Sequence, residues 1–144
     1  MMFRLLESLF GKSKFYPFET MILEKVMSRI EGENGLRLKQ QIGVINYIQR
    51  HREGREVNFY QMQNGKVIFD NNLRFPDSPE EEMLARVILR SPTETTELKA
   101  EIWMAGGRIF SLEFDKRPKQ YFSGIRLQDA RPEITEVVVC NGYS

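Results

Sequence analysis

Cysteine and histidine are nearly absent from this chain of 144 residues, which contains one of each, Cys140 and His51. A single cysteine excludes a disulfide within the chain and fits a reducing compartment, so a cytoplasmic location is expected. A zinc site built from cysteine and histidine lacks ligands, and no metal site is predicted. A catalytic triad would have to use His51. That residue lies in the charged segment R-H-R-E-G-R (50–55), where an exposed turn residue is the better interpretation.

Strong net charge and long hydrophobic runs are also missing. Lysine and arginine number 21 against 20 aspartate and glutamate, for a net charge of +1 at pH 7. A dedicated nucleic-acid-binding domain usually shows a clear basic excess. No apolar stretch approaches the roughly 18 residues of a membrane-spanning helix. Glycine-rich nucleotide-binding motifs and the calcium-loop pattern are absent as well, so no cofactor is predicted.

The first 15 residues, M-M-F-R-L-L-E-S-L-F-G-K-S-K-F, form a candidate amphipathic segment. Glu7 interrupts the apolar run and no small-residue cleavage site follows, which argues against a signal peptide. The segment can dock on its own domain or fray, and contact with a membrane surface through residues 1–14 is the less favoured alternative. Residues 16–144 have an ordinary globular composition and are predicted to form a single domain.

A helix is predicted to begin at Pro17 and to end near Gly32. Its apolar face consists of Ile22, Leu23, Val26, Met27 and Ile30, which recur at helical spacing. Alternation of apolar and polar residues over 36–49 then predicts a long half-buried strand.

Further strands are predicted from hairpin signals. Strands at 57–62 and 67–69 are joined by Asn64-Gly65, the strongest short hairpin signal in the chain. A last strand is predicted at 134–140.

The segment 79–89 is predicted to be a second short helix, because Ser78 and Glu81 match a capping box and Pro79 suits the first helical position. The stretch L-A-R-V-I-L (84–89) alone is also compatible with a strand. The expected fold class is therefore α+β. An antiparallel sheet of about five to six strands, built from hairpins, packs against the N-terminal helix and this second helix.

The paired glycines Gly106 and Gly107 join two alternating segments, 98–104 and 108–115, so they are interpreted as a hairpin turn and not as a phosphate-binding loop. A three-residue loop gives the most consistent pairing of apolar residues. It sets Leu98 opposite Phe114, Ala100 opposite Leu112 and Ile102 opposite Phe110. On the other face it sets Lys99 opposite Glu113 as an ion pair.

Three classes of function stay open. Charge is segregated along the chain, +4 over residues 1–66 and −4 over residues 67–101, and no motif forms an active site. This pattern favours a non-catalytic protein-binding module that uses arginine and aromatic anchors. The candidate binding residues are Arg50, Arg52, Arg55, Tyr60, Trp103, Arg117, Tyr121, Phe122 and Arg126, although Trp103 is equally consistent with the core.

The two alternatives rest on smaller groups of residues. Glu101, Glu113 and Asp115 could act as an acid–base set in a small-ligand-binding or hydrolytic pocket. The aromatic and basic residues between Tyr47 and Tyr60 could bind single-stranded nucleic acid, which the near-neutral total charge disfavours. An enzyme is thus the less favoured interpretation.

A short helix followed by antiparallel hairpins, together with the phrase G-G-R-I-F-S-L-E-F-D-K-R-P (106–118), resembles small bacterial immunity-type proteins, which neutralise a toxin encoded beside them. The similarity covers residues 16–140 as an arrangement of elements. It implies a protein partner and no catalysis, and it carries over no functional residue.

Overall fold

The computed structural model describes residues 15–143. The predicted N-terminal amphipathic segment lies outside these residues, except for its last position. The helices are α2 (Pro17–Arg29), α3 (Gly32–Gly43) and the single turn α4 (Pro118–Tyr121). The strands are β1 (Tyr47–His51), β2 (Glu56–Gln63), β3 (Lys66–Ile68), β4 (Glu81–Arg90), β5 (Leu98–Ala105), β6 (Arg108–Phe114) and β7 (Glu133–Val139). Short 3-10 turns, η1 (Arg52–Gly54), η2 (Asn71–Leu73) and η3 (Leu127–Asp129), connect them.

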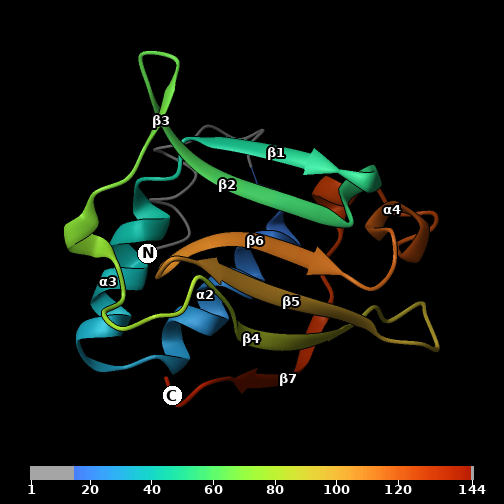
Figure 1. Cartoon of the computed structure of the whole chain (residues 1–144). Coiled ribbons are helices and arrows are strands. Elements are labelled where there is room, and N and C mark those ends of the chain that lie inside the picture. Colours follow the sequence, from blue (N-terminus) through green and yellow to red (C-terminus); the bar gives the residue numbers. More distant parts are fainter. Residues whose placement is uncertain (1–14, 144) are drawn as a thin grey trace.

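The seven strands form one antiparallel sheet in the order β1-β2-β6-β5-β4-β7, and β3 pairs with the far end of β2. Helix α2 lies behind the sheet in Figure 1, α3 lies at the left-hand end of the strands, and the β2–β3 hairpin projects beyond the sheet. The predicted α+β class with an N-terminal helix is confirmed, with more strands than expected. We call the face that points away from α2 and α3 the open face.

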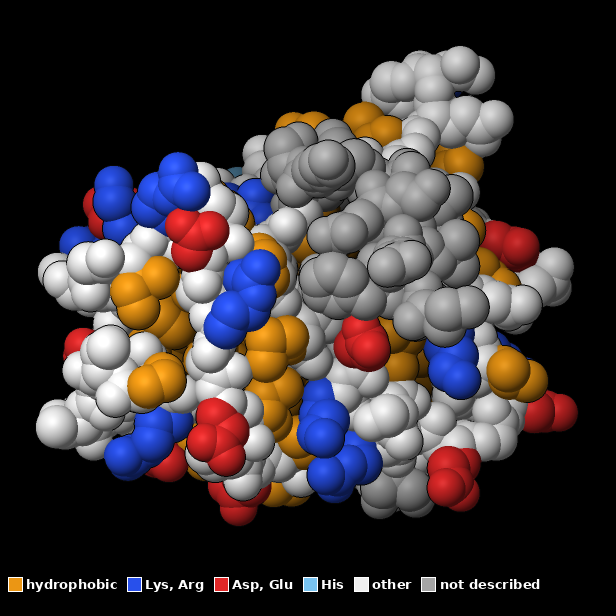
Figure 2. Space-filling view, turned by 180° about the vertical axis from the view of Figure 1, so that it is seen from behind, with side chains coloured by type: hydrophobic (Ala, Val, Ile, Leu, Met, Phe, Trp, Pro, Cys, Tyr) orange, Lys and Arg blue, Asp and Glu red, His pale blue; other side chains and the backbone are white. Residues whose placement is uncertain are grey.

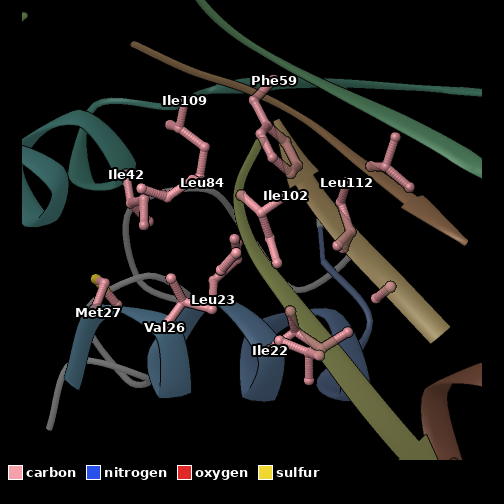
Figure 3. Packing of buried hydrophobic residues seen from close by; sticks show 14 of the residues in the cluster. Ile22, Leu23, Val26, Met27, Ile42, Phe59, Leu84, Ile102, Ile109 and Leu112 are labelled. Atoms are coloured by element: carbon pink, nitrogen blue, oxygen red, sulfur yellow. The ribbon is translucent and has the colours of Figure 1, made fainter. Parts of the chain in front are cut away.

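The core lies between the sheet and the two helices. Ile22 and Leu23 of α2 point toward Ile102 and Leu112 of the sheet (Figure 3). The view from behind shows basic and acidic side chains interspersed over the helix side of the molecule, with hydrophobic side chains between them (Figure 2). Charge on that side therefore does not single out a site.

Helix α2 forms where the sequence predicted it. Pro17 occupies the first helical position, and the backbone N–H of Tyr16 donates to Oε1 of Glu19 over 2.8 Å, which satisfies a donor ahead of the first turn. The apolar face predicted from helical spacing is buried.

The long strand predicted over 36–49 is wrong, because α3 occupies most of this segment. The buried residues Leu38, Gln41 and Ile42 recur at spacings of three and four, whereas Leu36 is 61% exposed. The apolar residues that alternate over 36–49 thus include both buried and exposed positions of the helix. Only its end, from Tyr47, is a strand.

The helix predicted over 79–89 is also wrong, since β4 runs through it. Val87 and Leu89 are buried while Arg86 and Arg90 are exposed, which is a strand pattern. The hydroxyl of Ser78 donates to the side chain of Glu82 and does not cap a helix. Pairing with β5 and β7 on both sides outweighed the local helix-start signal.

The β5–β6 hairpin confirms the structural role of the glycines and corrects the predicted pairing. Gly106 and Gly107, both at positive φ (56° and 80°), form a two-residue turn between Ala105 and Arg108. Phe110 is then an extra residue in β6, because Trp103 is paired with Ser111 and Met104 with Ile109. Beyond this bulge the register differs from the predicted one by two residues. The faces are as expected, but the cross-strand partners are different.

Candidate functional site

Strand alternation places a row of glutamates on the open face of the sheet. Glu56 of β2 is paired with Glu113 of β6, and Glu113 is paired with Glu101 of β5. We call these three residues the carboxylate row. It continues to His51 of β1 at one end and to Arg86 of β4 at the other. Like charges opposite each other on neighbouring strands destabilise a sheet, so folding stability does not explain the row.

The glutamates of the row have few protein partners. Glu113 accepts a hydrogen bond from the Ser111 hydroxyl (3.2 Å), and Glu101 accepts one from the indole N–H of Trp103 (3.2 Å). Within residues 15–143 the ion pairs shorter than 4.0 Å involve other carboxylates. The row is therefore not neutralised by direct contact with the protein's own described cations.

Burial of the carboxyl raises the pKa of Glu113 above the ordinary glutamate value. The hydrogen bond from Ser111 and the charge of Arg52 lower this pKa, and the charges of Glu56 and Glu101 raise it. The net direction is upward, so the protonated form of Glu113 is favoured relative to an ordinary glutamate.

The carboxylate row borders an open cavity of about 290 Å³. Its walls are formed by Arg52, Arg55, Glu56, Arg86, Lys99, Glu101, Glu113, Phe114 and Asp115. The glutamates are half-buried, whereas Arg52, Arg86 and Lys99 are exposed. The guanidinium of Arg55 donates to the backbone carbonyls of Phe114 (3.4 Å) and Asp115 (3.3 Å). The cavity thus has a carboxylate floor and a rim of solvated cations.

Asn58 lies on the same face, two residues along β2 from Glu56 and opposite Ser111. It is 6% exposed, and its Oδ1 is the one buried side-chain polar atom of residues 15–143 without a hydrogen-bond partner. A buried acceptor without a donor costs free energy. One buried amide oxygen beside the carboxylate row is therefore without a donor among the described residues.

A second group of residues lies around the end of the sheet toward the β2–β3 hairpin, with Tyr47, Tyr60 and Phe110 on the open face. Tyr47 is paired with Tyr60, with ring centroids 6.0 Å apart, and Tyr60 packs edge-on against Phe110 at 5.9 Å. The guanidinium of Arg108 lies over the rings of Phe110 (5.8 Å) and Phe69 (5.4 Å). Arg74 lies over Phe69 at 5.3 Å and donates to the carbonyl of Gly106. We call these residues the aromatic–arginine patch: Tyr47, Tyr60, Phe69, Phe110, Arg74 and Arg108.

Four of the predicted binding residues lie on the open face or at its rim. Arg52 and Arg55 line the cavity, Tyr60 belongs to the aromatic–arginine patch, and Trp103 contacts Glu101. The structure therefore brings this part of the predicted set together.

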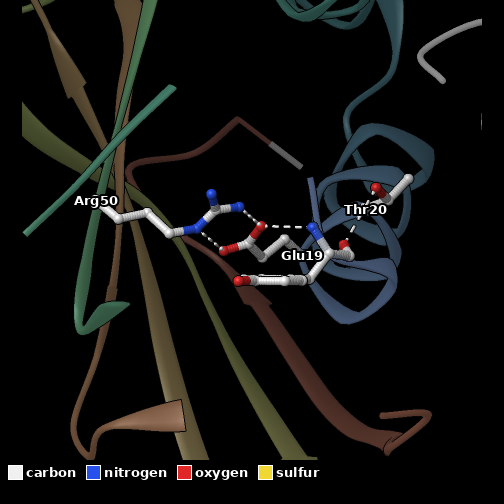
Figure 4. Close-up of polar contacts among 4 residues, drawn as sticks. Glu19, Thr20 and Arg50 are labelled. Carbon is white, nitrogen blue, oxygen red and sulfur yellow. Dashed lines mark hydrogen bonds and ion pairs between the residues drawn. The ribbon is translucent and has the colours of Figure 1, made fainter. Parts of the chain in front are cut away.

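Arg50 lies on the other face, where it binds Glu19 of α2 (Figure 4). Its Nη2 is 2.5 Å from Oε1 and its Nε is 3.2 Å from Oε2 of Glu19, and its guanidinium lies 4.4 Å from the ring centroid of Tyr16. The Glu19 side chain is 2% exposed, and burial raises its pKa although Arg50 and the Tyr16 N–H lower it. Arg50 thus connects the sheet to α2.

The remaining four predicted residues lie elsewhere. Phe122 is 1% exposed in the core, and the hydroxyl of buried Tyr121 donates to the carbonyl of Thr96 (2.8 Å). The prediction of Tyr121 and Phe122 as surface anchors is therefore corrected to a structural role. Arg117 and Arg126 are exposed and pair with Glu53 (3.4 Å) and Asp129 (2.9 Å), away from the carboxylate row.

Sequence reasoning missed most of the aromatic–arginine patch and the true partners of Glu113. The predicted pair of Glu113 with Lys99 is wrong, because Glu101 is opposite Glu113. The backbone N–H of Lys99 donates to the side chain of Asp115 (2.9 Å). The bulge at Phe110 changes the register, and nothing in the alternation of the two segments indicates that a bulge is present.

No group of three or more residues suited to holding a metal ion is found in the described part of the chain. None of its helices has the length and apolarity needed to cross a membrane. Comparison of the chain with protein-family models, with curated proteins and with solved structures gives no match.

Proposed function

We propose that the protein is a non-catalytic protein-binding module whose partner docks on the open face of the sheet. The observation that carries the proposal is the presence, on this one face, of the aromatic–arginine patch beside the carboxylate row. Tyrosine, tryptophan and arginine supply most of the binding energy at protein interfaces, and charge complementarity supplies specificity.

The open face offers both kinds of contact. Tyr47 is 42% exposed, and Tyr60, Phe110 and Trp103 are half-buried, so their rings are held by neighbours while part of their surface is accessible. Rings already fixed in place lose little conformational entropy on binding. The cation–π contacts of Arg108 likewise hold its guanidinium in place, so this side chain also loses little conformational entropy on binding.

The proposal extends to the kind of protein. The resemblance to bacterial immunity-type proteins supports a cytoplasmic protein that binds and neutralises, or accompanies, another protein. Binding such a partner requires a broad contact surface, which the open face offers, and does not require a catalytic group on this chain.

The test is purification of the tagged protein from its native cells, with and without nuclease, in three forms. The wild type is compared with Tyr60→Ala, in the patch, and with Leu36→Ala, an exposed residue of α3 on the other side. A stoichiometric protein should accompany wild type and Leu36→Ala and be lost with Tyr60→Ala, and purified components should reproduce this. A partner retained equally by all three forms contradicts the proposal. Material removed by nuclease instead indicates a nucleic-acid ligand.

A second candidate function, an acid–base pocket, is favoured by the raised pKa of Glu113 beside Glu101. One protonated and one ionised carboxyl can act as acid and base in a hydrolytic reaction. The cavity of about 290 Å³ is at the small end for a ligand pocket. Hydrolysis of a glycoside or ester substrate by the wild type, abolished by Glu101→Gln, would establish this function over the first.

A further inference from the structure

We propose that Arg108, with the charge of Arg74 beside it, binds the carboxylate of an aspartate or glutamate side chain of the docked partner protein. This inference rests on the proposed function, since it names the chemistry of the contact that the partner makes with the arginines of the aromatic–arginine patch. The observations behind it are the charge of Arg108, which no described acidic group neutralises, the fixed position of both arginines, and a small hollow next to Arg108.

Arg108 is a half-buried cation without an acidic partner among residues 15–143. Its guanidinium forms no ion pair and donates no hydrogen bond within these residues, although a guanidinium has N–H donors on all three nitrogens. The contacts that hold it are instead with the rings of Phe69 and Phe110. Arginine keeps its charge in such surroundings, so the donors that the rings do not cover are available to an acceptor from another molecule.

The surroundings of Arg108 disfavour an isolated positive charge. Burial lowers the pKa of Arg108 below the ordinary arginine value, and the charge of Arg74 lowers it further, while Tyr60 raises it. Two like charges close together at one surface repel each other, and an anion beside them offsets this repulsion. A carboxylate can also accept two parallel hydrogen bonds from one guanidinium, which is among the stronger polar contacts in proteins.

Arg74 is held in place by the β5–β6 turn. The N–H of Phe75 donates to the carbonyl of Gly107 (2.8 Å), and the Arg74 guanidinium donates to the carbonyl of Gly106 and to the side chain of Asn71 (3.1 Å). A Cβ on Gly107 would lie 2.5 Å from the Arg74 side chain, so this close approach depends on glycine. The cation is thus in position before a partner arrives, and little conformational entropy is lost on binding.

The size of the site and its distance from the carboxylate row favour a single acidic side chain over a polyanion. A hollow of about 20 Å³, lined in part by Tyr60, Phe69 and Arg108, has room for about one water-sized polar group. Glu56 lies on the same face of β2 as Tyr60, roughly 13 Å away along the strand. A nucleic acid that extended from Arg108 along β2 would meet this glutamate and the rest of the row, which charge repulsion disfavours.

The experiment is an NMR titration of the ¹⁵N-labelled full chain with the peptide acetyl-Tyr-Glu-Tyr-amide. Its one carboxylate tests the arginine contact, and its aromatic rings can pack on Tyr47 and Tyr60. We expect saturable shifts of the amides of Phe69, Arg108 and Phe110, with a dissociation constant on the order of 1 mM. The matched peptide acetyl-Tyr-Gln-Tyr-amide has nearly the same shape and no charge, and it should bind at least about tenfold more weakly.

Three variants locate the contact. Arg108→Met removes the charge and keeps an unbranched apolar stem, and it should weaken binding of the glutamate peptide at least about tenfold. Arg74→Met should weaken it at least about threefold, because it removes the neighbouring charge. Arg29→Met removes an exposed arginine of α2, behind the sheet, and should leave the dissociation constant within about twofold of wild type. The ¹⁵N spectrum of each variant shows whether the native fold is retained.

Four results overturn the inference. The first two are the absence of saturable binding of the glutamate peptide and equal affinity for the glutamine peptide. The third is an unchanged affinity in Arg108→Met or, if that variant loses the native spectrum, an unchanged affinity in Arg74→Met. The fourth is tighter binding of inorganic phosphate than of the glutamate peptide at the same amides, which would indicate a phosphate site.

The outcomes separate this inference from the proposed function. A partner that is lost with Tyr60→Ala but retained in full by Arg108→Met contradicts the carboxylate contact alone. Binding of the glutamate peptide at Arg108, together with a partner that Tyr60→Ala retains, contradicts docking of that partner on the open face alone.

Discussion

Glu101 and Glu113 face each other across the β5–β6 ladder, and Glu56 faces Glu113 from the other side. Three like charges in neighbouring positions are unfavourable for the folded state, and burial adds to the cost of ionising Glu113. The row is therefore expected to cost stability, as groups arranged for binding often do.

Replacing Glu113 by Gln should stabilise the protein at neutral pH, by roughly 0.5 kcal/mol given partial exposure. The sign follows from the raised folded-state pKa of Glu113. Above that pKa the carboxylate is ionised in both states and disfavours folding, and below the unfolded-state pKa of about 4.3 it is neutral in both. The gain should thus vanish as the pH falls to that value.

Urea unfolding of wild type and Glu113→Gln at several pH values measures this effect. Glu136→Gln is the control, because Glu136 is paired with the apolar Ile88. A Glu113→Gln variant less stable than wild type at pH 7 would show that the row stabilises the fold, which the structure does not predict.

Replacing Glu19 by Ala should destabilise the protein by about 3 kcal/mol, because it removes the partner of a largely buried Arg50 and the acceptor for the Tyr16 N–H. Adding Arg50→Met should recover part of the loss, since it removes the cation left without its carboxylate. Chemical denaturation of the two single variants and the double variant measures the coupling. Additive losses would mean that the contact in Figure 4 contributes nothing.

Two glycines of α3 should respond to alanine in opposite directions. A Cβ on Gly35 would overlap the carbonyl oxygen of Ile30, so Gly35→Ala should destabilise the protein by roughly 1–3 kcal/mol. A Cβ on Gly43 meets nothing within 4 Å, so Gly43→Ala should stabilise the helix by about 0.5 kcal/mol. Melting temperatures of both variants decide the point, and losses of equal size would contradict the close approach of α3 to the end of α2.

Gln41 connects α3 to the β5–β6 turn. Its side-chain amide donates to the carbonyls of Leu73 (2.6 Å) and Gly107 (3.0 Å), and it accepts from the N–H of Ile109 (2.7 Å). Gln41→Leu leaves these buried backbone groups without partners and should cost about 2–3 kcal/mol. The exposed neighbour provides the control, Gln40→Leu, which should change stability little. Calorimetric unfolding measures both variants. Equal losses of stability in Gln41→Leu and Gln40→Leu would contradict a stabilising role for the hydrogen bonds of Gln41.

The sequence predicted those elements whose local signals agree with their tertiary setting. Helix α2 has its start signal and its apolar face, and Asn64-Gly65 has both positive φ values that a two-residue turn requires (53° and 77°). The segments that became α3 and β4 carry conflicting signals. Packing of Leu38 and Ile42 against the sheet, and pairing of β4 with two strands, decided between them.

The candidate site was less predictable than the fold, because it depends on register. Glu101 and Glu113 were identified as a possible pair, but a single extra residue at Phe110 decides whether Glu113 faces a lysine or a glutamate. The aromatic–arginine patch joins residues from β1, β2, β6 and the segment after β3, and no spacing in the sequence brings these together.

The most direct test of docking on the open face is the affinity of the purified partner for three forms of this protein, measured by isothermal titration calorimetry. We expect Tyr60→Ala to raise the dissociation constant at least about tenfold, and Leu36→Ala on α3 to leave it within about twofold of wild type. An unchanged affinity for Tyr60→Ala, with the loss appearing in Leu36→Ala, would place the interface on the helix side and contradict the account.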